Sequence, residues 1–122
     1  MTNHTRESLT ATTKTFLAAN PEEVKREAQI SLMSQHSLPA SEAQNHADLL
    51  YQCMGTSPES SLGFGPFFGL SEDEPQWEVT LSAGSESAKF LCGLDDDGEI
   101  YLMADVPSQE RGKIEKSLAT PA

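Results

Sequence analysis

The sequence predicts an α+β protein in which helices come first, an antiparallel sheet follows and a short helix ends the chain. In the first half, apolar residues recur at helical spacing, whereas from about residue 62 they alternate with polar ones. An Asp-Gly pair, Asp97-Gly98, then separates two apolar runs, which is a strong hairpin signal. The length of 122 residues suits one domain, 1–122, with frayed ends at 1–5 and 119–122.

The first two helices are expected over 6–19 and 21–36. The first has a narrow apolar stripe, formed by Leu9, Thr13, Phe16 and Leu17. Before the second, Asn20-Pro21-Glu22-Glu23 is a start signal, with Asn20 as the cap and Glu23 completing a capping box. The second helix has apolar residues on two neighbouring stripes: Val24, Ala28 and Leu32 on one, and Ile30 and Met33 on the other. It therefore needs one broad buried face or two separate contacts.

A third helix is expected over 41–54, with Ser41 and Gln44 as a capping box and a stop at Gly55. The second and third helices form a helical hairpin, a shape that DNA-binding proteins also use. Residues 42–48, where a recognition helix would read DNA, contain no Lys or Arg. A DNA-binding function is therefore excluded.

Three to four strands follow, over about 62–70, 76–83, 88–94 and 99–106. The first contains glycines and Pro66, which fits only a broken or edge strand. In the second, Trp77, Val79 and Leu81 alternate with polar residues, which predicts one buried face. Asp97-Gly98 is expected to make the tight turn between the last two strands, with Gly98 at positive φ. A short helix from Ser108 to Leu118 completes the chain.

The charge excludes several partners. Eight Lys and Arg against nineteen Asp and Glu give a formal net charge of −11, which repels nucleic acids and anionic membranes. A basic protein is a suitable partner. The chain has neither a membrane span nor a secretory signal, so a cytosolic location is expected. Cys53 and Cys92 lie in apolar patterns without CxxC spacing, which indicates two buried thiols rather than a disulfide.

The sequence offers no catalytic, metal or cofactor site. The aspartates 95–97 and Glu99 are consecutive rather than spaced as in a calcium loop, so they are interpreted as a solvated hairpin tip. His4, His36 and His46 are too scattered to share a zinc ion with a cysteine. Neither a nucleophile elbow nor a phosphate-binding loop is present. A non-enzymatic protein without cofactor or metal is expected.

The candidate site is a partner-binding surface in the glycine-rich segment after residue 62. It combines three phenylalanines with an acidic turn: Phe64, Phe67, Phe68, Glu72, Asp73 and Glu74. The three rings cannot all point to one side of a short, kinked strand. Aromatic anchors inside a charged rim are typical of protein interfaces. The alternative is that this segment folds onto the core.

Residues 90–106, FLCGLDDDGEIYLMADV, resemble the strand, Asp-Gly turn and strand of class I type III secretion chaperones, and the following helix extends the resemblance over about 88–118. Small size and acidity are also similar. The resemblance implies a cytosolic homodimer that holds an extended segment of a secreted effector protein.

Three functions therefore remain open. The first is a non-enzymatic acidic protein-binding module, of the chaperone kind or another, that holds a partner protein. The second is an immunity or inhibitor protein that neutralises a basic toxin or nuclease. The third is a small-ligand-binding or orphan enzyme domain, which would need an enclosed pocket with convergent polar groups.

Overall fold

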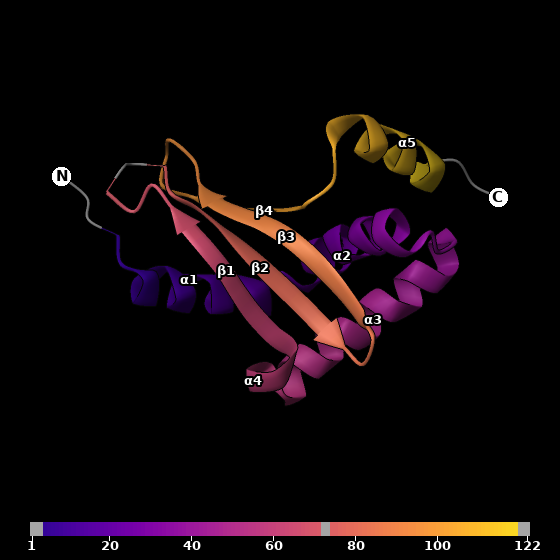
Figure 1. The fold of residues 1–122 in the computed structure, drawn as a ribbon, viewed down its shortest axis with the longest axis horizontal. Coiled ribbons are helices and arrows are strands. Elements are labelled where there is room, and N and C mark those ends of the chain that lie inside the picture. The colour runs from indigo at the N-terminus through magenta and orange to yellow at the C-terminus, as the bar shows by residue number, and fades with distance from the viewer. Residues whose placement is uncertain (1–3, 72–73, 120–122) are drawn as a thin grey trace.

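The computed structural model describes residues 4–71 and 74–119, and it confirms the α+β class. The chain forms α1 (Arg6–Ala19), α2 (Pro21–His36), α3 (Ala40–Thr56), α4 (Pro58–Ser61), β1 (Leu62–Phe68), β2 (Gln76–Ala83), β3 (Glu86–Leu94), β4 (Ile100–Ala104) and α5 (Ser108–Ala119). Figure 1 shows the strands side by side as one sheet.

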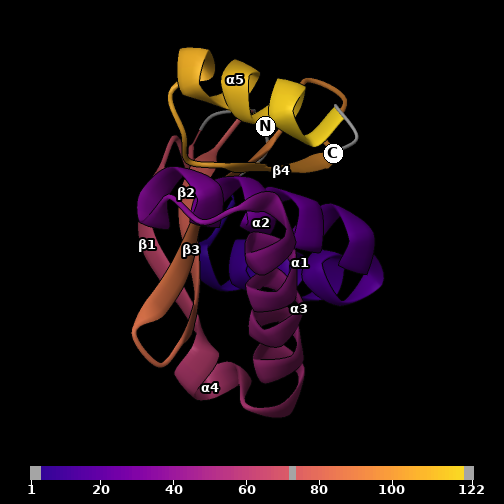
Figure 2. The same cartoon turned by 90° about the vertical axis from the view of Figure 1, so that its right-hand side faces the viewer.

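The sheet is antiparallel throughout and has the order β1-β2-β3-β4. Figure 2 shows α1, α2 and α3 together on one side of it, with α5 beyond the β4 edge. We call the side under these three helices the covered face and the opposite side the outer face. In the part of the chain that the structure describes, no helix lies on the outer face.

The predicted bounds agree for α1, α2 and β2, and differ elsewhere. The third helix begins one residue before Ser41 and continues past Gly55 to Thr56. It is followed by the short helix α4, in a segment for which the sequence predicted neither helix nor strand. β1 ends at Phe68, whereas β3 begins earlier, at Glu86, and β4 covers only Ile100–Ala104.

The helix caps differ from those predicted. Asn20 precedes α2, but its side chain makes no cap there and donates instead to the Phe16 carbonyl, at the end of α1. Ser41 lies inside the first turn of α3, whose N-cap residue is Pro39, so the expected capping box is absent. Thr5, expected in a frayed tail, forms a capping box with Ser8. Residues 1–3 and 120–122 lie outside the described residues.

The core has two clusters, and α2 contributes to both. The larger cluster lies between the covered face and α1–α3, and it includes Val24, Ala28 and Leu32 of α2. The smaller cluster joins Ile30 to Ala104 and Ile114 of α5. Of the two alternatives for α2, two contacts are observed: Val24, Ala28 and Leu32 serve the larger cluster and Ile30 the smaller one, while Met33 packs against both.

A buried ion pair attaches α5 to the rest of the fold. Glu27 of α2 is 5% exposed, and its carboxylate accepts two hydrogen bonds from Arg111 of α5, at 2.6 and 2.9 Å. The same carboxylate accepts the Ala104 amide at 2.8 Å. Successive backbone amides of a strand point to opposite sides. The Asp105 amide points towards β3 and donates to the Lys89 carbonyl, so the Ala104 amide points away from β3, to the free edge of β4. One side chain thus links α2, α5 and the sheet edge.

The β3–β4 hairpin forms as expected, but with a different turn. Gly98 has φ of +79°, which confirms its predicted positive φ. The Gly98 amide bonds to the Asp95 carbonyl at 2.9 Å, and the Asp95 amide bonds to the Glu99 carbonyl at 2.9 Å. This is a three-residue loop that ends in a left-handed glycine, rather than a two-residue turn centred on Asp97-Gly98.

We expect Gly98→Ala to lower the free energy of unfolding by about 1 kcal/mol, because the left-handed region penalises a Cβ. Gly112→Ala provides the control, since Gly112 lies inside α5 with open space around its Cα. This change should stabilise the protein by about 0.5–1 kcal/mol. Urea unfolding of both variants measures the difference, and an unchanged midpoint for Gly98→Ala would contradict the turn geometry.

Candidate functional site

A β-bulge determines which phenylalanine of β1 reaches solvent. Phe64 is paired with Val79 and Phe67 with Trp77, so β1 has one extra residue between these pairs. A regular strand would place Phe64 and Phe68 on one face and Phe67 on the other. The bulge instead places Phe64 and Phe67 on the covered face and Phe68 on the outer face. The expectation that the three rings cannot share one side is confirmed.

Phe64 and Phe67 pack against the main core cluster. The Phe67 ring stacks on the buried indole of Trp77, with centroids 5.8 Å apart and planes 12° apart. Phe64 lies next to Phe67, at 6.2 Å between centroids. The Arg6 guanidinium is 5.0 Å from the centre of the Phe67 ring. These two rings are therefore part of the packing under β1, whereas Phe68 is 56% exposed.

Phe68 belongs to a row of outer-face residues that crosses all four strands. The pairing places it beside Gln76, which is beside Gly93, which is beside Tyr101. A Cβ at Gly93 would collide with the hydroxyl end of the Tyr101 ring, so this ring occupies the space that a side chain at position 93 would fill. The Gln76 side-chain amide donates to the Tyr101 hydroxyl at 2.8 Å. Tyr101 thus extends from β4 across β3 towards the strand that is paired with Phe68.

The next row of the outer face is also partly apolar. Glu78 is paired with Leu91, and Leu91 with Met103, which is 39% exposed. Together with the first row, these residues form a surface that we call the outer apolar patch: Phe68, Leu91, Tyr101 and Met103. Of these four, only Phe68 was predicted from the sequence.

Acidic groups lie at the end of the sheet that carries Phe68. The β1–β2 and β3–β4 loops are both at this end, because β1 and β3 end there and β2 and β4 begin there. Glu74, in the first loop, is exposed, whereas the predicted rim residues Glu72 and Asp73 lie outside the described residues. In the second loop, Asp96, Asp97 and Glu99 are exposed. The predicted acidic turn therefore has a second acidic loop beside it.

The carboxylates of Asp95, Asp96 and Asp97 lie within 4.8 Å of one another at the hairpin tip. The Asp95 carboxylate accepts the backbone amides of Asp97 and Glu99, each at 2.9 Å. These bonds stabilise the turn, which gives Asp95 a structural role. Of the histidines, His46 lies 2.8 Å from a Glu86 oxygen, and this contact joins α3 to β3.

Both edges of the sheet are irregular. At the β4 edge, the Ala104 amide donates to the Glu27 carboxylate, and the Ala104 carbonyl accepts a hydrogen bond from the Val106 amide at 2.9 Å. The β1 edge contains the bulge and Pro66, which has no amide to donate. Such features oppose the addition of a further strand. The faces of the sheet are therefore more open to a contact than its edges.

Both cysteines are free thiols. Cys92 is buried on the covered face as predicted, whereas Cys53 is only half-buried. Burial raises the pKa of the Cys92 thiol to about 12, because the low-dielectric surroundings disfavour the thiolate. Cys92 therefore behaves as an apolar packing residue, without the reactive character of a catalytic thiol.

Comparison of the chain with protein-family models, with characterised proteins and with solved structures finds no match. Within the described residues, none of the helices combines the length and the apolar character that a membrane crossing requires.

We expect Phe67→Ala to destabilise the protein by about 2 kcal/mol, because it removes the ring stacked on Trp77 at a half-buried site. Phe68→Ala is the matched control on the neighbouring residue. It should change the free energy of unfolding by less than about 0.5 kcal/mol, as is usual for exposed positions. Thermal or urea unfolding compares the two, and equal losses would mean that Phe68 is also packed.

We expect Cys92 to resist alkylation by iodoacetamide at pH 8 in the folded protein. With a pKa of about 12, only about one thiol in ten thousand is ionised at that pH, and the fraction rises tenfold per pH unit. Mass spectrometry of the Cys53→Ser variant measures the labelling of Cys92 alone, and that of the Cys92→Ser variant measures the labelling of the half-buried Cys53 alone. Labelling of both thiols at similar rates in native buffer would contradict the burial of Cys92.

Proposed function

We propose that this chain is a non-enzymatic protein-binding module that contacts its partner through the outer apolar patch. The observation that carries this proposal is the exposure of Phe68 and Met103 on a sheet face without a covering helix among the described residues. Apolar patches of this kind mark contact sites in many proteins. Aromatic side chains such as Phe68 and Tyr101 are common anchors in protein interfaces.

The fixed position of the Tyr101 ring supports a contact through the face of the sheet. Gly93 lets the Tyr101 ring lie along the sheet, and Gln76 fixes that ring by a hydrogen bond. A side chain that is already held in place loses little conformational entropy when a partner binds. Because the β1 and β4 edges are irregular, binding by addition of a partner strand to the sheet is less suitable than binding to its face.

The charge favours a basic partner. The patch ends at loops that contain Glu74, Asp96, Asp97 and Glu99, and the whole chain has a formal net charge of −11. Complementary charges around an apolar centre increase association rates and select partners. An inhibitor of a basic toxin or nuclease is the second candidate function, and these same carboxylates favour it.

The chaperone-like role and the homodimer that the sequence resemblance implies stay predictions. A sheet face with apolar anchors suits an extended segment of an effector protein as well as a folded partner. The free thiols Cys53 and Cys92 are compatible with a location in the reducing cytosol.

We expect Phe68→Ala to abolish recovery of the native partner in an affinity capture from the source cell, while the variant remains folded. Leu49→Ala is the matched control, because Leu49 is 48% exposed but lies on α3, in the helical layer. It should recover the same partner as the wild type. If Phe68→Ala recovers that partner in equal amount, the outer apolar patch is not the contact surface.

A further inference from the structure

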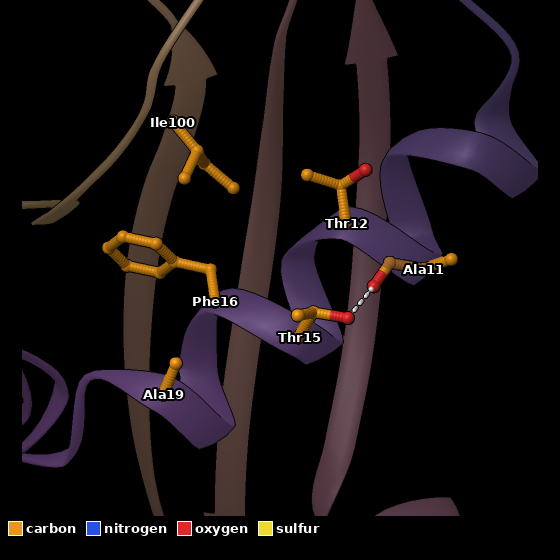
Figure 3. Close-up of a pocket in the computed structure, with 6 residues that line it drawn as sticks. All are labelled: Ala11, Thr12, Thr15, Phe16, Ala19 and Ile100. Atoms are coloured by element: carbon orange, nitrogen blue, oxygen red, sulfur yellow. Dashed lines mark hydrogen bonds between the residues drawn. The ribbon is translucent and has the colours of Figure 1, made fainter.

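A second apolar surface lies on the flank of α1. It is a hollow of about 450 Å³, and its lining residues are Ala11, Thr12, Thr15, Phe16, Ala19 and Ile100. Figure 3 shows five of these on one flank of the helix and Ile100 across from Phe16. Ile100 packs against the core cluster of the covered face, whereas the next residue, Tyr101, lies on the outer face. The hollow and the outer apolar patch are thus separate surfaces on either side of the start of β4.

The hollow is apolar despite its two threonines. The Thr12 hydroxyl donates to the Ser8 carbonyl at 2.9 Å, and the Thr15 hydroxyl donates to the Ala11 carbonyl at 3.1 Å. Figure 3 shows the Thr15 hydroxyl turned towards Ala11 in this bond. Because both hydroxyls bond to the helix backbone, they are poor donors for a polar ligand. Methyl groups and the Phe16 ring therefore dominate the lining, and none of the lining residues is charged.

Negative charge lies immediately beside this apolar surface. Ile100 directly follows the acidic loop 95–99, in which Asp96, Asp97 and Glu99 are exposed. The aspartate carboxylates of this loop are within 4.8 Å of one another. This field attracts a cation and repels an anion, and it also repels another copy of a chain with a net charge of −11.

We propose that the hollow seats one apolar or aromatic side chain of a partner protein, whose neighbouring Lys or Arg side chains approach the loop 95–99. The proposal rests on the protein-binding function above and adds a second anchor point to it. One helix flank and one strand residue line the hollow, so an occupant is contacted from one side only. A side chain that its own protein supports from behind fits this geometry better than a small molecule, which usually needs enclosure.

Three small probes that share an indole ring test the chemistry without knowledge of the partner. They are tryptamine, which is cationic, indole-3-acetamide, which is neutral, and indole-3-acetate, which is anionic. We expect amide shifts in NMR spectra around Ala19 and Ile100, with affinity falling from cation to neutral to anion. The cation should exceed the neutral probe by up to about fivefold at low salt, the range of an exposed charge pair. High salt should reduce this preference.

A matched pair of variants tests the location. Ala19 lines the hollow, whereas Ala18, at the preceding position of the same helix, is exposed and is not part of the lining. Ala19→Leu should fill the hollow and weaken tryptamine binding at least tenfold, and Ala18→Leu should leave it unchanged. The double variant Asp96→Asn, Asp97→Asn should reduce the difference in affinity between the cationic and the neutral probe.

Three outcomes would overturn the proposal. Equal affinity for the three probes would exclude the role of the loop, and equal effects of the two leucine variants would exclude the hollow. A wild-type dimer that Ala19→Leu, but not Ala18→Leu, dissociates in analytical ultracentrifugation would make a second copy the occupant. Phe68→Ala separates the two proposals: it should leave tryptamine binding intact even where it abolishes partner capture. If the probes bind as expected but Phe68→Ala keeps the partner, the outer apolar patch fails and the hollow remains.

Discussion

The buried indole of Trp77 positions most of the features described above. Its Nε1 donates to the Thr13 hydroxyl at 2.9 Å, and that hydroxyl donates to the Leu9 carbonyl at 2.7 Å. A buried indole N–H requires an acceptor, so this bond fixes α1 against β2. The indole also stacks against the Phe67 ring. One side chain at the centre of the covered face thus holds both α1, which carries the hollow, and Phe67, which precedes the exposed Phe68.

The pattern of apolar residues was sufficient to predict α1, α2, α3, α5 and the strand segments in chain order, but not the short helix α4. Helical spacing identified α1 and α2, and alternation identified β2, because each buries one face. The caps were less predictable. Asn20 has the chemistry to cap α2, since its side-chain oxygen can accept a backbone amide of the first turn. Its side-chain NH2 group donates instead to the Phe16 carbonyl, and the sequence does not show which of the two bonds forms. Such choices depend on the angle between two helices, which tertiary packing determines.

The candidate site was predicted only in part, for similar reasons. The cluster of phenylalanines was visible, but the bulge after Phe64 decides that Phe68 is the exposed ring, and a one-residue shift reverses this choice. Leu91 gave a signal, since it shares the solvent-facing side of its strand with Lys89. The hollow gave none, because Ile100 and α1 are brought together by the fold.

The Glu27–Arg111 pair also places a condition on when the chain can finish folding. The two residues are 84 positions apart, so during synthesis α2 leaves the ribosome long before α5 does. Until α5 emerges, burial of Glu27 leaves a carboxylate without its cation, which is costly in an apolar environment. In the nascent chain, a hydrated Glu27 is therefore favoured over a buried one. Docking of α2 onto the sheet edge becomes favourable only once α5 is present to supply Arg111.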